Sequence, residues 1–327
     1  MRRQEKPLRD DVKTLVRIDE ETDVQYGKRP ERRSVEELME YGIAPVDKPQ
    51  GPSSHEVTSW VRKMLGASKA GHSGTLDPNV SGVLPVGLNR ATRAMGLMLK
   101  SSKEYVGIIK FHCDVSEDKV KTIFKKFSGE VEQMPPVKSA VKRVLRKRKV
   151  YYLEPLEFNG REVLFRVGCE AGTYIRKLCF DMGEELGCGA NMLELRRTKA
   201  AGLEESRISR LQDVKDAYWL WKEKGDEREM RKVILPIEDV LNLRRIWLRD
   251  SAVEAVCSGA VLAAPGVAKL DEGIATGDNV ALMSLKDELV AFSVAEAGSD
   301  EILAMKNGIA ARTIRVMMKK GTYPKCW

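Results

Sequence analysis

Residues 71–93 read GHSGTLDPNVSGVLPVGLNRATR, in which a glycine-rich approach leads to one acidic side chain, Asp77, and directly on to Pro78. An aspartate before proline in such a setting is commonly a turn former. Its carboxylate is ionised at neutral pH, so it can also act as a nucleophile without a general base. The stretch predicts a loop, and by itself it leaves both roles of Asp77 open.

The segments before this loop carry helix signals. Ser34 and Glu37 have the spacing of a capping box and predict a short helix that ends at Gly42. An extended segment follows, and Ser54 is expected to cap a second helix whose apolar residues share one face and which ends at Gly66.

The segments after the loop mix strands with helices. Residues 103–114 read as a strand, residues 120–127 as an amphipathic helix before Gly129, and residues 151–169 as a strand pair. Thr173 is expected to cap another helix, and residues 209–232 form a charged helical stretch. Hairpin-like pairs in this irregular order predict an α+β sheet domain rather than a doubly wound one.

The two ends of the chain differ from this middle part. From about residue 243, short strands separated by Gly and Asp turns, with one short helix at 251–259, predict a small β-barrel. Residues 1–33 hold ten basic and eight acidic side chains, too polar for a core of their own. We therefore expect a charged extension at 1–33, packed on the barrel, a catalytic domain at 34–242 and a barrel domain at 243–327.

Composition narrows the class of protein. Of 327 residues, 43% are hydrophobic and 32% charged, as in globular proteins, and no stretch has the length of a membrane span. Neither a membrane nor a secretion route is expected, so the prediction is a cytoplasmic protein. Six scattered cysteines and three histidines show no metal-ligand spacing, so we expect reduced thiols and no metal.

A basic run points to the partner. Residues 138–149, KSAVKRVLRKRK, hold seven cations and no acid, within a chain of formal net charge +8. The run is either a solvated face or, as we favour, a contact for nucleic-acid phosphates, because Tyr151 and Tyr152 follow with rings able to stack on bases. The predicted RNA contacts are Lys138, Lys142, Arg143, Arg146, Lys147, Arg148 and Lys149.

Arg176 lies in the first turn of the helix expected after Thr173. A cation there opposes the helix dipole by about 0.3 to 1 kcal/mol, so an anion is expected opposite it. That anion is Asp77 if the two form an ion pair; a phosphate or a local Glu is the alternative.

Several motifs together resemble one family. Residues 71–93, KEYVG at 103–107, PPVKSAVKRV at 135–144 and AGTYIRKL at 171–178 resemble the TruB/dyskerin family of RNA pseudouridine synthases. Residues 246–278 resemble a PUA domain, an RNA-binding module. The resemblance covers residues 41–327. DKPQGPSSHEV at 47–57 and the final YPKCW are similar to the archaeal catalytic subunit of box H/ACA ribonucleoproteins.

The resemblance implies roles for individual residues. Asp77 matches the catalytic aspartate, Tyr105 an active-site tyrosine that stacks on the base and transfers a proton, and Arg176 the ion-pair partner. Further matches imply substrate contacts and loop support. The implied substrate-binding residues are His72, Tyr174 and Leu195, and those that support the catalytic loop are Lys48 and Pro49.

The implied fold is the pseudouridine synthase fold, with a mixed, largely antiparallel central sheet, plus a β-barrel PUA domain. The implied function is isomerisation of uridine to pseudouridine in rRNA, and in tRNA as a further substrate, directed by box H/ACA guide RNA. The implied partners are guide RNA, substrate RNA and small H/ACA core proteins. The isomerisation needs no cofactor. A stand-alone tRNA pseudouridine synthase and a non-catalytic RNA-binding scaffold remain alternatives, and the sequence leaves open whether Asp77 attacks base or sugar.

Overall fold

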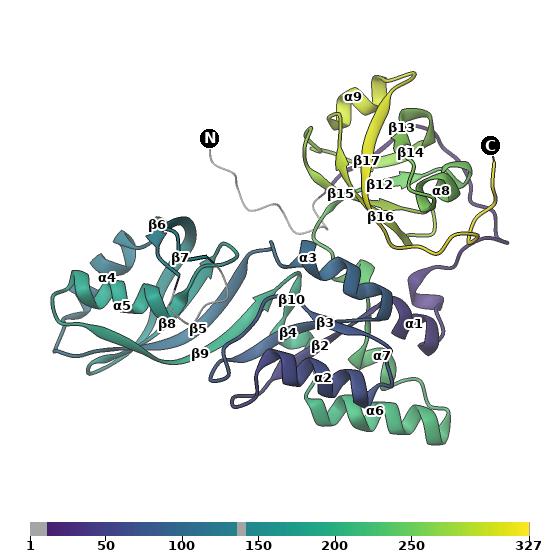
Figure 1. The fold of residues 1–327 in the computed structure, drawn as a ribbon. Helices are drawn as coiled ribbons and strands as arrows, with labels where there is room; N and C mark the ends of the chain where they lie inside the picture. Colours follow the sequence, from purple (N-terminus) through teal and green to yellow (C-terminus); the bar gives the residue numbers. More distant parts are fainter. Residues whose placement is uncertain (1–11, 136–141, 327) are drawn as a thin grey trace. The chain divides into compact units, whose positions relative to one another are not determined.

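The computed structural model describes residues 12–135 and 142–326, which fall into two compact units (Figure 1). The first unit joins residues up to 42 with those from 235 onward, and the second comprises residues 43–234. Along the described ranges, none of the helices combines the length and the apolar character needed to cross a membrane.

A mixed sheet is the centre of the second unit. Its order is β2-β4-β9-β5-β8-β7-β6, with β3 paired to β4 and β10 to β9; only the β4–β9 pairing in this series is parallel. The α+β class with a mixed, largely antiparallel sheet is therefore confirmed. The strands are β2 (Gly42–Lys48), β3 (Ala70–His72), β4 (Ser81–Leu88), β5 (Lys103–Phe111), β6 (Gly129–Gln133), β7 (Arg146–Asn159), β8 (Glu162–Cys169), β9 (Ala190–Ala200) and β10 (Leu203–Glu204).

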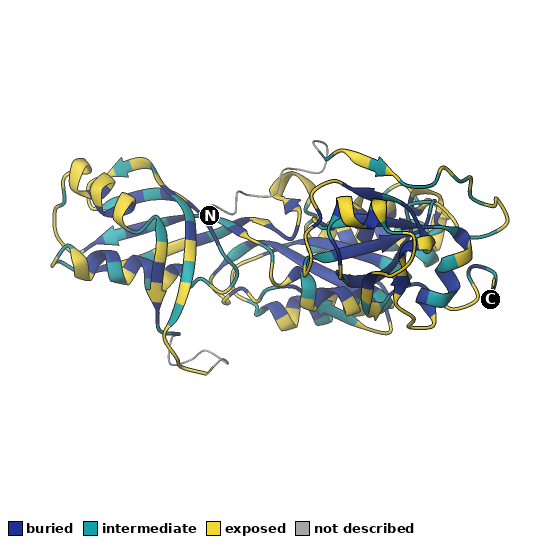
Figure 2. Cartoon of the chain, turned by 90° about the horizontal axis from the view of Figure 1, so that it is seen from above, coloured by how far each residue is buried: buried dark blue, intermediate teal, exposed yellow. Residues whose placement is uncertain are grey.

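Helices pack at both ends of this sheet. In Figure 1, α4 and α5 lie at one end of it and α2 and α6 at the other. Buried residues follow the strands between them (Figure 2), and a cluster that includes Phe111, Phe124 and Phe165 joins α4 and α5 to the sheet. The helices are α2 (Ser54–Met64), α3 (Met95–Met98), α4 (Glu117–Lys126), α5 (Ile175–Glu185), α6 (Leu211–Lys224) and α7 (Met230–Val233).

Two of the predicted helix caps in this unit are wrong. The capping box of α2 is formed by Ser53 with Glu56, not by Ser54, because only Ser53 has Glu at the third helical position. The N-cap of α5 is Tyr174, and the Thr173 hydroxyl instead donates to the carbonyl of Glu170 over 2.8 Å.

The first unit contains the barrel. Its strands run in the order β1-β14-β12-β15-β16-β17-β13 around a core that includes Ile246, Leu282 and Val290. A helix at 299–304 was not predicted, since its six residues are too few for an amphipathic period to be recognised. The elements are β1 (Thr14–Val16), α1 (Val35–Tyr41), β11 (Leu235–Pro236), β12 (Arg244–Leu248), α8 (Asp250–Cys257), β13 (Leu262–Ala263), β14 (Val267–Asp271), β15 (Asn279–Met283), β16 (Leu289–Ala295), α9 (Ser299–Ala304) and β17 (Ile309–Val316).

Residues 12–33 run along the barrel. β1 pairs antiparallel with β14, and the Asp250 carboxylate accepts hydrogen bonds from the hydroxyl of Thr22 and the backbone N–H of Asp23. Arg33 makes a two-pronged ion pair with Glu238 at 2.8 and 2.9 Å, with both side chains buried. Burial of this pair means that removing either partner would leave an uncompensated charge, so the pair fixes the end of the segment.

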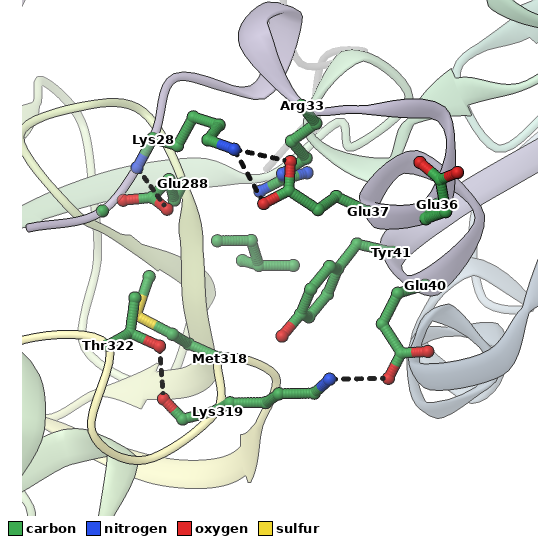
Figure 3. Close-up of a pocket in the computed structure, with 12 residues that line it drawn as sticks. Lys28, Arg33, Glu36, Glu37, Glu40, Tyr41, Glu288, Met318, Lys319 and Thr322 are labelled. Atoms are coloured by element: carbon green, nitrogen blue, oxygen red, sulfur yellow. Dashed lines mark hydrogen bonds and ion pairs between the residues drawn. The ribbon is translucent and has the colours of Figure 1, made fainter.

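A cavity of about 520 Å³ lies within the first unit (Figure 3). The predicted capping box of Ser34 and Glu37 begins the helix that lines it, α1. The ammonium group of Lys28 donates to both carboxylate oxygens of Glu37, at 2.9 and 2.8 Å, and Lys319 lies 3.5 Å from Glu40. Two ion pairs, Lys28–Glu37 and Lys319–Glu40, thus lie in the lining of this cavity.

Candidate active site

Asp77 lies in the loop between β3 and β4, and Arg176 in the first turn of α5. A guanidinium nitrogen of Arg176 donates to a carboxylate oxygen of Asp77 over 2.5 Å, with side chains 58% and 55% exposed. A pair so exposed contributes at most about 1 kcal/mol to stability. The helix dipole opposes a cation at this position by a similar amount. The arrangement therefore does little for folding, and it holds the carboxylate of Asp77 in place where a ligand can reach it.

The loop that carries Asp77 is anchored on both sides. Leu76 and Val80 are buried, and the N–H of Val80 donates to the carbonyl of Asp77 over 3.0 Å. The buried Ser54 hydroxyl accepts from the Leu76 N–H at 2.9 Å and lies 3.1 Å from its carbonyl. Ser54 is thus a loop anchor, while its neighbour Ser53 is the helix cap.

Lys48 is fully buried beneath the same loop. Its ammonium group donates to the carbonyls of Pro49, Pro78 and Val80 at 2.8 to 3.0 Å. Burial lowers the pKa of Lys48, while the nearby Asp77 charge partly offsets that change. The structure therefore brings Lys48 and Pro49 to the loop that they were predicted to support.

Arg197, on β9, was not singled out from the sequence. Its side chain is 1% exposed, and its guanidinium donates to the carbonyls of Val83 and Gly74 at 2.8 and 2.9 Å. Gly74 has φ of +82°, and a Cβ atom built there would lie 3.2 Å from this guanidinium. The sequence could have pointed to Arg197, because it lies two residues after Leu195 on one strand. Residues at that spacing share a face of the sheet, so Arg197 faces the same side as Leu195.

Tyr105 lies on β5 opposite Arg197 and is partly buried. Burial raises the pKa of its hydroxyl; the charge of Arg197 and a hydrogen bond with it act against that, while the charge of Asp77 adds to it. The phenol is therefore protonated at neutral pH, and it lies close enough to Arg197 and Asp77 for both charges to affect its pKa. Leu195 lies across from Gly107, where an added Cβ would come within 2.8 Å of its side chain, so this glycine makes room for it.

His72 and Tyr174 lie on either flank of the loop and helix. The His72 ring contacts the Thr58 hydroxyl at 3.1 Å and meets the His55 ring edge-on at 4.8 Å. Burial, followed by the charges of His55 and Arg197, lowers the pKa of His72, which favours a neutral imidazole. Tyr174 is held through its backbone by Gln133, which accepts from its N–H at 2.9 Å and donates to its carbonyl at 3.1 Å.

The basic run is only partly open to a ligand. Lys138 lies outside the described residues, and Arg146–Lys149 form the start of β7, paired with β6. Lys147 donates to Glu130 of β6 over 2.7 Å, so one of the predicted phosphate contacts already has an acidic partner. The Tyr152 hydroxyl donates to Glu104 over 2.5 Å. The exposed members of the run are Lys142, Arg143, Lys147 and Lys149.

Family models match the chain along most of its length. They are the TruB family pseudouridylate synthase N-terminal domain at residues 62–175, the tRNA pseudouridylate synthase B C-terminal domain at 176–242, the PUA domain at 244–317 and the DKCLD domain at 4–58. Fold and site together define the class as a pseudouridylate synthase joined to a PUA domain.

Individual relatives agree with this class. A protein of Methanosarcina barkeri named "Probable tRNA pseudouridine synthase B" is 54% identical over 94% of this chain and 91% of its own length. A solved Cbf5–Nop10–Gar1 complex has a chain that is 50% identical, with TM-score 0.92 over 96% of this chain and 97% of that one. A structure of an H/ACA ribonucleoprotein bound to substrate RNA containing 2′-deoxyuridine has a chain that is 47% identical to this one. The TM-score is 0.91, over 98% of this chain and 100% of that chain. The chain belongs to the TruB/dyskerin family of pseudouridine synthases.

Proposed function

We propose that this protein isomerises uridine to pseudouridine in RNA under the direction of box H/ACA guide RNA, with rRNA as substrate and tRNA as a further one. The observation that carries the proposal is the exposed Asp77–Arg176 ion pair on an anchored loop. The family match and the H/ACA complexes among its structural relatives support it. A position inside the cell is part of the proposal and agrees with six free cysteines.

The reaction assigns a role to each group near Asp77. The bond from N1 of the base to the sugar breaks, the base turns, C5 bonds to the sugar and loses its proton, and N1 gains one. Asp77 is the nucleophile, and Arg176 holds its carboxylate in position. Tyr105 provides a ring on which the base stacks and a hydroxyl for proton transfer at C5. Leu195 supplies apolar contact for a base that has left its stack.

Arg197 is the proposed positioning residue of the site. One guanidinium bonds to Gly74 before the Asp77 loop and to Val83 of β4, and Arg197 lies opposite Tyr105 in the sheet, so a single rigid group relates the nucleophile to the tyrosine. Such groups act by keeping reacting atoms within a near-attack geometry. Lys48 and Ser54 fix the loop from its other side.

RNA is proposed to reach this site along three parts of the chain. His72 and Tyr174 flank the loop and contact the substrate strand, the basic run at 138–149 contacts phosphates, and the PUA barrel from residue 243 grips guide RNA. The charged segment at 1–33 completes the barrel domain, and residues 34–242 are proposed as the catalytic domain. Small core proteins of the kind found in the solved H/ACA complexes are the proposed protein partners.

The salt dependence of RNA binding tests the basic run. Replacing Lys147, Arg148 and Lys149 together by alanine should weaken binding and reduce the slope of log affinity against log salt by about 1 to 2. The slope change falls short of three contacts because Lys147 already pairs with Glu130. A matched control replaces the exposed helix lysines Lys119, Lys121 and Lys125 and removes equal charge elsewhere. Equal slopes for both triple variants would leave the run as a solvated face.

The curated relatives' name favours a second function, a tRNA pseudouridine synthase that acts without a guide. An assay of pseudouridine formation on an rRNA target and on tRNA, each with and without guide RNA and the core proteins, separates the two. Guide-directed action predicts that the rRNA product appears only with guide. Equal product on both RNAs without guide would support the stand-alone enzyme instead.

A further inference from the structure

Two cysteines of the second unit face each other where β5 ends and β9 begins. The register pairs Lys110 with Asn191 and Phe111 with Ala190. It continues with a 3.0 Å hydrogen bond from the His112 N–H to the Gly189 carbonyl. Cys113 and Cys188 are the residues that directly adjoin this bonded pair, just beyond the ends of the two strands. A disulfide requires two Cα atoms about 4.4 to 6.8 Å apart.

Electrostatic and hydrogen-bond contacts also place the two cysteines in one neighbourhood. The neighbouring Cys188 thiol, followed by the charge of Asp114, raises the pKa of the Cys113 thiol, which places the two thiols close to each other. Arg161 donates to Asp114 over 2.7 Å and to the His112 carbonyl over 3.2 Å, which places a cation beside the pair. Cys113 is exposed and Cys188 partly so, so a small molecule can reach them.

The other four cysteines differ from this pair in exposure or in their place in the chain. Cys169, Cys179 and Cys257 are buried, and burial raises the pKa of Cys169 to about 12, which leaves almost no reactive thiolate. Cys326 is exposed, near the end of the chain. Exposure and a facing thiol therefore coincide at Cys113 and Cys188.

We propose that Cys113 and Cys188 form a redox modification site that closes into a cross-strand disulfide on exchange with a low-molecular-weight disulfide such as oxidised glutathione. One thiolate attacks the small disulfide and releases one molecule of reduced glutathione. The second thiolate then displaces the other. The two protein thiols lose two protons and two electrons, and the oxidant is reduced to two thiols.

Closure would clip together the ends of β5 and β9, whose opposite ends carry Tyr105 and Arg197. The disulfide would constrain the unfolded chain between residues 113 and 188. It should therefore raise the unfolding midpoint of the oxidised protein, by on the order of 5 °C. The inference does not depend on the proposed function, since neither thiol takes part in the isomerisation.

The test uses the full chain carrying Cys326→Ser, so that the remaining exposed thiols are the pair itself. After incubation with oxidised glutathione, peptide mapping without reduction should recover one linked peptide joining Cys113 to Cys188, and no glutathione adduct at either. Formation should quicken from pH 7 to pH 9 as more thiolate forms. Adding Cys113→Ser should abolish both the link and the rise in midpoint.

Two outcomes would overturn the proposal. In the first, Cys113 and Cys188 each carry a separate glutathione and remain unlinked. In the second, both thiols stay unreacted under conditions in which Cys326 of the native chain is fully modified. A link that forms without a higher midpoint would overturn the predicted clip between β5 and β9.

Discussion

Replacing Asp77 by asparagine should lower pseudouridine formation by at least about a thousandfold, because the amide keeps the shape of the side chain and loses the nucleophile. Affinity for guide RNA should stay within about twofold, since one carboxylate on the loop contributes no phosphate contact. Single-turnover product formation and a filter-binding titration on the same preparation measure both quantities.

Asp47→Asn is the matched control for this experiment. Asp47 also carries an arginine partner, Arg196, with contacts of 2.9 and 3.1 Å in the same unit. Its loss removes an ion pair of the same type without touching the loop, so activity should change little. Retained activity in pure Asp77→Asn protein would refute the nucleophile. It would also favour an RNA-binding scaffold if the native chain were inactive on every RNA tested.

Replacing Arg197 by methionine should give the second largest loss, about 100-fold in the rate of the chemical step, because displacement of a reacting group by about 1 Å costs that much. The substitution also leaves the carbonyls of Val83 and Gly74 unpaired, each at about 1 to 3 kcal/mol of stability. The assay is therefore run well below the unfolding midpoint of the variant, with the folded fraction measured by circular dichroism.

If Arg197 positions the reacting groups, its variants should change the rate of the reaction more than the binding of substrate RNA. Arg197→Lys restores one donor and should recover part of the rate, and KM for substrate RNA should change far less than kcat in both variants. Arg196→Met is the neighbouring control, since Arg196 is 37% exposed and bonds to acids rather than to the loop. Equal losses at 196 and 197, or a native kcat in Arg197→Met, would contradict the assignment.

Helix-capping motifs predicted the start of one helix correctly and failed where two neighbouring residues could each act as the cap. The capping box at Ser34 and Glu37 lies within four residues, and the helix forms there. At Ser53 and Ser54 the local signal favours Ser53, because only Ser53 has Glu three residues on, and the Ser54 hydroxyl bonds to the Leu76 backbone instead. Thr173 failed as a cap for the same reason, because its hydroxyl bonds to Glu170. A residue type that can cap a helix does not show which backbone group its hydroxyl will bond.

The amino-acid sequence alone determined the family, the α+β class and the choice of Asp77, because these depend on motifs and apolar periods that are complete within short windows. Only the tertiary structure decided that Arg176, 99 residues away, meets Asp77, that Arg197 is buried beneath the loop and that Cys113 faces Cys188. The place of Arg197 opposite Tyr105 follows from strand register, and a shift of one residue would turn its side chain to the other face of the sheet. The Asp77–Arg176 contact depends instead on how α5 packs beside the loop between β3 and β4.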